Sequence, residues 1–109
     1  MTAAPWREKL RAATTESEVV EVATAYLQTL DRMHVAMLPL RCRPRALRCA
    51  YDVSSYAFEL VGHYSDKSDD AGARVVQSLA TFFTDASIRL SEIIAETNRR
   101  EATLPSRAT

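Results

Sequence analysis

The chain is poor in the residues that break helices. Its 109 residues include two glycines and four prolines. Because these breakers are widely separated, long helices can form between them, and a glycine-rich phosphate loop is excluded. No alternation of apolar and polar residues bounded by turns competes with helix. These absences favour an all-α fold.

Net charge and long apolar runs are also lacking. Fourteen basic residues balance fourteen acidic ones, which argues against wholesale binding of a polyanion. No run approaches the roughly 20 apolar residues that span a bilayer, and residues 1–13 contain no signal-peptide core. Twelve of the basic residues are arginines, as is common in GC-rich bacterial genomes. We therefore expect a single domain over residues 1–109 in the bacterial cytoplasm, with no membrane partner.

Only two cysteines occur, Cys42 and Cys49. A closed zinc site would need a second cysteine pair, and a loop residue and a helix residue seven apart are poorly placed for a disulfide. We expect two reduced thiols, no cofactor and no metal. A mildly reactive Cys42 thiol, with a pKa lowered by the arginines on either side, is the alternative to an ordinary loop thiol.

The spacing of the apolar residues, in steps of three and four, predicts four helices. Pro5 suits the first turn of a short helix, and Thr15 with Glu18 has the capping-box form that opens a long one. Pro39 ends that helix, and Gly62 is the expected left-handed cap of the next. The predicted helices and a frayed tail cover residues 5–13, 16–38, 44–61, 69–100 and 101–109.

Three long helices with short connections pack as an antiparallel bundle, with the short N-terminal helix beside them. In the 44–61 helix, the stripe expected to face the core consists of Leu47, Tyr51, Ser54, Phe58 and Val61, and it is widened by Ala50, Ala57 and Leu60. Other apolar residues lie off the narrow stripes, at Tyr56, Phe82 and Ile94, and the 69–100 helix is longer than its neighbours. We therefore expect a homodimer in which a second copy covers the excess. The alternative is that the short N-terminal helix folds back and covers it within one chain.

A cluster of arginines without intervening carboxylates is the least usual local feature. It comprises Arg41, Arg43, Arg45 and Arg48. Three of them surround the predicted start of the 44–61 helix, where the helix dipole disfavours positive charge, so a functional or compensating role is expected. An up-down-up bundle would place the cluster beside Arg99 and Arg100, with the acidic run at 66–70 at the opposite end.

This predicted basic end has two interpretations. Guanidinium groups and free backbone N–H groups suit a phosphate or carboxylate, so the six arginines are candidates for binding an anion or an acidic partner. Alternatively, the arginines are solvated or pair with acidic residues of the last helix, Glu92, Glu96 or Glu101. Trp6 is a candidate partner anchor, or else a plug for the end of the bundle.

Catalytic and metal-binding patterns are weak. Two pairs have helical spacings that can place two ligands on one face, Asp31 with His34 and Glu59 with His63, but neither matches the Glu-x-x-His form of metal sites in bundles. Ser54 lacks a histidine on its own face. We predict a non-enzymatic interaction or regulatory module that binds another protein. A nucleic-acid-binding module using the same arginines is the first alternative, and a bundle enzyme or metal carrier is the second.

Overall fold

The computed structural model describes residues 4–64 and 71–103, and these residues are mostly helical and contain no β-strand. The all-α prediction is confirmed. Among the helices of these two ranges, none combines the length and apolar content that crossing a membrane requires. The elements are α1 (Ala4–Ala12), α2 (Glu16–Gln28), α3 (Arg32–Met37), the single-turn 3₁₀ helix η1 (Leu40–Cys42), α4 (Ala50–Tyr64) and α5 (Ala71–Thr103).

The start of α2 follows the predicted capping box. Thr15 has an extended backbone, and its hydroxyl oxygen accepts a hydrogen bond from the Glu18 backbone N–H at 3.1 Å. In return, the Glu18 carboxylate accepts hydrogen bonds from the hydroxyl groups of Thr14 and Thr15, at 3.0 and 3.2 Å. One of the otherwise unpaired N–H groups of the first turn is thereby satisfied, which fixes where the helix begins.

The predicted single helix over 16–38 is wrong, because the chain forms two helices, α2 and α3, with a break at residues 29–31. The Asp31 carboxylate accepts a hydrogen bond from the His34 backbone N–H at 2.8 Å and so caps a new helix. An aspartate in an extended conformation at this position competes with continuation of the helix. Helix α3 ends at Met37, and Leu38 is extended before Pro39, as predicted.

The predicted helix over 44–61 is also wrong at both ends, because α4 spans Ala50–Tyr64. Residues 43–49 are non-helical, and the Asp52 carboxylate accepts a hydrogen bond from the Arg48 backbone N–H at 2.8 Å just before α4 begins. This start avoids packing the arginines into a helical first turn, where the dipole opposes them. Gly62 lies inside α4, and no described residue has a positive φ, so Gly62 is not a left-handed cap.

The remaining boundaries differ less. The first helix is shifted by one residue from the predicted 5–13, to Ala4–Ala12. The last helix continues to Thr103 rather than ending at Arg100, so the first part of the predicted tail is helical. Residues 69–70 and 104–109 lie outside the described residues.

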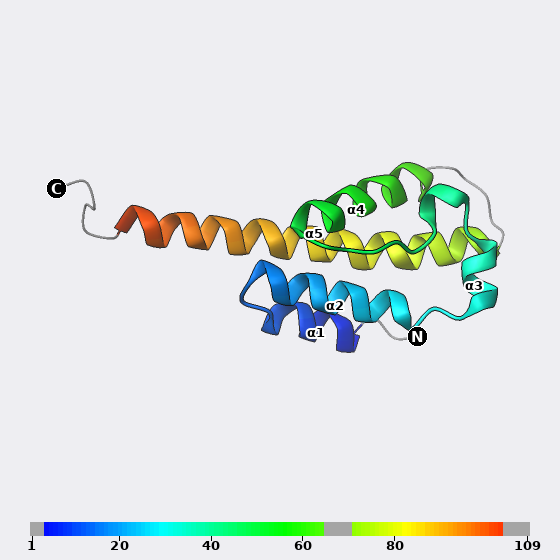
Figure 1. Cartoon of the computed structure of the whole chain (residues 1–109), viewed down its shortest axis with the longest axis horizontal. Helices are drawn as coiled ribbons and strands as arrows, with labels where there is room; N and C mark the ends of the chain where they lie inside the picture. Colours follow the sequence, from blue (N-terminus) through cyan, green and yellow to red (C-terminus); the bar gives the residue numbers. More distant parts are fainter. Residues whose placement is uncertain (1–3, 65–70, 104–109) are drawn as a thin grey trace.

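Helix α5 is the element on which the others pack (Figure 1). Helix α4 covers one side of it, and α1 and α2 cover another. The core contains a cluster of rings in which Tyr26 stacks on Phe82 with centroids 3.9 Å apart, while Tyr56 meets Phe83 edge-on at 4.7 Å. Each such pair adds about 0.5–1.5 kcal/mol to the effect of burial. The last buried residue of α5 is Ile93, so ten residues of this helix project beyond the core.

The connectivity differs from an up-down-up bundle. Residues 43–49 run back along the molecule without forming a helix, so α2 and α4 both run antiparallel to α5 (Figure 1). Seven residues span at most roughly 23–25 Å when fully extended, which is about the length of the 15-residue α4. Among the described residues, α5 is the one helix of more than 15 residues, so the expected arrangement of three long helices with a short fourth is not confirmed.

The predicted basic end of the molecule is wrong for the same reason. Cys42 contacts Tyr56, which packs on Phe83 of α5. Arg99 follows Phe83 by sixteen residues, or about 24 Å of helix. Arg41 and Arg43, which adjoin Cys42, and Arg45, which lies over the Tyr56 ring, therefore do not lie beside Arg99 and Arg100. The acidic run at 66–70 lies outside the described residues.

Candidate interaction surfaces

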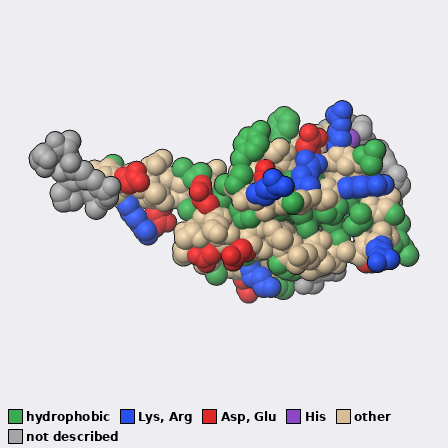
Figure 2. Space-filling view, viewed as in Figure 1, with side chains coloured by type: hydrophobic (Ala, Val, Ile, Leu, Met, Phe, Trp, Pro, Cys, Tyr) green, Lys and Arg blue, Asp and Glu red, His purple; other side chains and the backbone are tan. Residues whose placement is uncertain are grey.

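Residues 41–48, here called the arginine segment, follow the face of the molecule beside α4. Figure 2 shows Lys and Arg side chains gathered on this face. Leu38 and Cys42 anchor the beginning of the segment, since both are buried, and Leu47 packs partly against the core near its end. The Tyr56 hydroxyl donates a hydrogen bond to the Cys42 carbonyl at 2.5 Å. The backbone is therefore held against α4 while four arginine side chains face outward.

The arginines of this segment have backbone and ring partners rather than acidic ones. Arg43 Nε donates to the Leu38 carbonyl at 3.4 Å, and Arg45 donates to the Arg41 carbonyl. The Arg45 guanidinium also lies 4.8 Å from the centroid of the Tyr56 ring. Within residues 4–64 and 71–103, none of the four arginine side chains forms an ion pair. The expected pairing with acidic residues of the last helix does not occur there.

Two of the acidic residues expected to pair with the arginine segment, Glu92 and Glu96, pair instead with arginines of α5. Glu92 pairs with Arg89 at 3.5 Å, and Glu96 pairs with Arg100 at 2.7 Å, both within α5. The six candidate arginines therefore fall into two separate groups, one beside α4 and the other on the projecting part of α5.

The backbone of the arginine segment is also unpaired in its central part. The N–H groups of Arg45, Ala46 and Leu47 donate no hydrogen bond to any described residue. They lie between the bond from Arg43 N to the Leu40 carbonyl and the bond from Arg48 N to Asp52. An exposed segment with free N–H groups can accept an added strand from a partner.

Burial, not the neighbouring arginines, determines the chemistry of Cys42. Its side chain is fully buried, and desolvation raises the pKa of the thiol above its ordinary value of 9.0. Glu59 raises the pKa further, whereas Arg45 lowers it. The alternative of a reactive thiol with a lowered pKa is therefore wrong. Cys49, in contrast, is exposed, and both cysteines are free.

Helix α4 has a second apolar face that points to solvent. The predicted core-facing stripe is wrong for three residues: Tyr51 is 76 % exposed and Phe58 82 % exposed, and Val61 is also exposed. It is confirmed for Ala57 and Leu60, which are buried. The residues that face the core are Val53, Tyr56, Ala57 and Leu60. Tyr56 decides this orientation because its ring packs on Phe83 while its hydroxyl reaches Cys42. In Figure 2, hydrophobic side chains stand out of the surface over α4.

The residues from which a dimer was predicted are mostly internal. Tyr56 and Phe82 are buried within the chain, and only Ile94 of the three remains exposed. The prediction of a homodimer assumed that all three side chains were available to a second copy, and this assumption is wrong for Tyr56 and Phe82.

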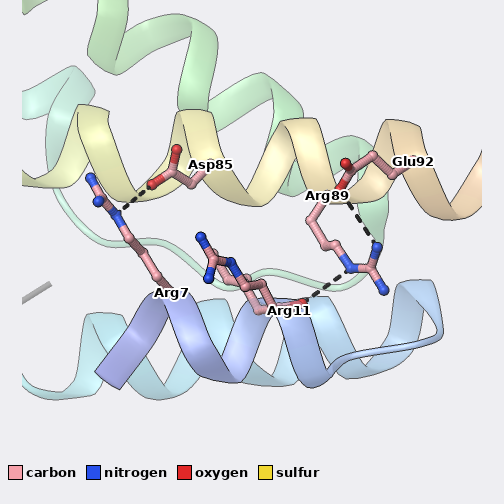
Figure 3. A pocket seen from close by; sticks show the side chains of 6 residues that line it. Arg7, Arg11, Asp85, Arg89 and Glu92 are labelled. Atoms are coloured by element: carbon pink, nitrogen blue, oxygen red, sulfur yellow. Dashed lines mark hydrogen bonds and ion pairs between the residues drawn. The ribbon is translucent and has the colours of Figure 1, made fainter. Parts of the chain in front are cut away.

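A groove of about 340 Å³ lies between α1 and α5 (Figure 3). Arg7 pairs with Asp85 across it at 3.3 Å. Arg89 donates to the carbonyl oxygens of Leu10 and Ala13, at 3.2 Å and 2.7–3.1 Å, and so satisfies the end of α1. These bonds attach α1 to α5, and we assign the groove a structural role.

Trp6 lies at the same contact. Its ring meets Tyr26 edge-on at 5.3 Å and Phe82 at 6.3 Å, and Lys9 Nζ lies 4.3 Å from its centroid. The indole packs on the core from α1, in accordance with the interpretation as a plug.

The weak metal and catalytic patterns do not assemble into sites. The 3.2 Å contact of His34 Nδ1 with Asp31 belongs to the cap of α3. In the described part of the chain, no three His, Cys, Asp or Glu side chains are grouped to hold a metal ion. The Ser54 hydroxyl lies 3.4 Å from the Ser87 hydroxyl, where α4 meets α5.

Comparisons with protein-family models, with curated proteins and with solved structures find no match to this chain.

Proposed function

We propose that this chain is a non-enzymatic protein-interaction module that binds an acidic segment of a partner protein along the arginine segment. The observation that carries the proposal is the set of four arginine side chains without a carboxylate partner among the described residues. Carboxylate groups are the natural complement, because the guanidinium fork matches their geometry and binds them through two parallel hydrogen bonds.

The backbone supports an extended occupant. Successive N–H groups of an extended segment point to opposite sides, so the free N–H groups of Arg45 and Leu47 can donate to the carbonyl groups of a peptide laid alongside them. The anchors at Leu38, Cys42 and Leu47 hold the segment in place, so little ordering is needed on binding.

Binding of nucleic acid by the same arginines has less support. Arg99 and Arg100 lie on the part of α5 that projects beyond the core, and α4 carries Asp52 and Glu59, which would repel phosphates. The exposed Tyr51 ring, close in sequence to Arg48, is the feature that favours it, since aromatic rings stack on bases.

The test measures binding of two labelled probes by fluorescence anisotropy, a glutamate-rich peptide and an oligo-dT strand of equal charge. The variant Arg41→Ala/Arg48→Ala removes two guanidinium groups whose side chains make no bond to described residues. The control Arg74→Ala/Arg99→Ala removes the same charge from exposed sites on α5.

We expect the peptide to bind the wild type and the control alike, and to bind the first variant roughly fivefold more weakly, because two exposed ion pairs contribute on the order of 1 kcal/mol together. Equal affinities for both variants would contradict the proposal. Tighter binding of the oligonucleotide, falling steeply between about 50 and about 200 mM salt, would assign the segment to nucleic acid instead.

A further inference from the structure

The outer face of α4 carries uncharged residues at the spacing that is typical of a helix packed against another helix. No described residue covers this face. Tyr51, Ser55, Phe58 and Gly62 follow one another in steps of four, three and four, with Val61 beside them. The opposite face of the same helix is buried in the core. A helix that is apolar on both faces is normally covered on both.

Helix α5 continues this surface with a second stripe in the same steps. The stripe contains no charged residue and comprises Thr84, Ile88, Ser91, Ala95, Asn98 and Ala102. Ser87, next to it, meets Ser54 of α4 at 3.4 Å, so the two outer faces adjoin. Ile88 is 55 % exposed.

Five of the charged residues of α5 form a stripe on another side of the helix. Asp85, Arg89, Glu92, Glu96 and Arg99 also follow steps of three and four, and Asp85 and Arg89 bond to α1. On α4, Asp52, Glu59 and His63 lie on the flank towards the arginine segment rather than among Tyr51, Phe58 and Gly62. The outer faces of α4 and α5 thus form one surface, here called the neutral face, without a charged side chain in the two stripes.

We infer that the neutral face is where two copies of this chain associate. A second copy is the occupant that its charge pattern fits best. A partner of either charge would leave its ionised groups unpaired against this face, whereas a copy related by a two-fold axis presents the same uncharged surface. Depletion of charge and exposed aromatic side chains are also typical of the centre of an interface.

Gly62 lies in the same outer stripe of α4. A β-carbon built on Gly62 meets no atom of the described residues within 4 Å. Small residues at Ser55 and Gly62, on either side of Phe58, would allow the backbone of a second helix to approach closely. A two-fold axis near Phe58, the most exposed aromatic residue, places the two α4 helices antiparallel.

The test compares the mass in solution of the wild type, Phe58→Glu and Met33→Glu by sedimentation equilibrium. Met33 is the matched control, because it is 68 % exposed on α3, outside the neutral face. Both variants add one carboxylate in place of an exposed apolar side chain, and circular dichroism confirms that both remain folded.

We expect the wild type and Met33→Glu to have twice the chain mass of 12.2 kDa, and Phe58→Glu to have the mass of one chain. We also expect dissociation of the dimer to depend little on salt, unlike binding to the arginine segment. A wild type of one chain mass at about 100 μM, or a Phe58→Glu variant that remains a dimer, would overturn the inference. Neither of these mass measurements depends on the glutamate-rich peptide. Failure of the dimer inference can therefore be distinguished from failure of the proposed binding to the arginine segment.

Discussion

At the residue scale, Cys42 shows how burial outweighs nearby positive charge. Its carbonyl accepts the Tyr56 hydroxyl bond and its side chain has no exposure, so desolvation raises the pKa of the thiol although Arg45 acts in the opposite direction. Burial also raises the pKa of the Tyr56 hydroxyl, which stays protonated and can donate that bond. The arginine segment therefore has a fixed, neutral base beneath its charged side chains.

This predicts unequal reactivity of the two thiols. With Ellman's reagent at about pH 8, we expect one fast-reacting thiol per native chain, from Cys49, because thiolate is the reacting form and a raised pKa keeps Cys42 protonated. The Cys49→Ser variant should show no fast phase, and unfolding in denaturant should release the second thiol. Two fast thiols in the native wild type would show that Cys42 is accessible.

At the element scale, the capping residues decide where the chain turns. Asp31 begins α3 in the middle of an apolar pattern that continues without interruption from Val19 to Met37. Periodicity alone does not distinguish one helix from two that share a phase, because the pattern of apolar residues is the same in both.

Replacement of Asp31 tests the cap. We expect Asp31→Ala to lower the free energy of unfolding by about 1 kcal/mol, since the His34 N–H loses its acceptor. Asp31→Asn keeps a side-chain oxygen at the cap and should lie within a few tenths of a kcal/mol of the wild type. Chemical denaturation followed by circular dichroism measures both. Equal losses in the two variants would indicate that the carboxylate charge, not the hydrogen bond, is what stabilises α3.

Much of the fold follows from local signals. The scarcity of breakers, the Thr15–Glu18 capping box and the stop at Pro39 predict helices and two of their boundaries. The orientation of α4 does not follow, because both of its faces are apolar and its sequence pattern suits either one. Tyr56 selects the buried face through Phe83 and Cys42, and these long-range contacts are not visible in the spacing of residues.

Only part of the arginine surface could be predicted, because its full composition also depends on long-range contacts. The unusual density of arginines in residues 41–48 is apparent from the sequence, but their grouping with Arg99 and Arg100 required the direction of each helix. That direction depends on residues 43–49 crossing the molecule without a helix, which Pro44 alone does not indicate. The neutral face was missed because Tyr51 and Phe58 were assigned to the core.

At the scale of the whole molecule, the surface divides into regions with different character. The arginine segment is basic and lies on one side of α4. The charged stripe of α5 contacts α1 through Asp85 and Arg89, and the neutral face is formed by the outer faces of α4 and α5. A dimer formed through the neutral face would leave both arginine segments free, and would present two of them to a partner. Two linked sites bind a partner with two acidic segments more tightly than either alone.

The distance between the two Cys49 residues in solution tests the central claim most directly. Cys49 is exposed and immediately precedes α4, so it accepts a nitroxide label without any substitution, while Cys42 is buried. With the two-fold axis at Phe58, nine residues away, antiparallel α4 helices place the two Cys49 backbones about 30 Å apart. Double electron–electron resonance should show one distance near this value in the wild type and none in Phe58→Glu. Absence of dipolar coupling in the wild type, or a distance that the substitution leaves unchanged, would contradict association through the neutral face.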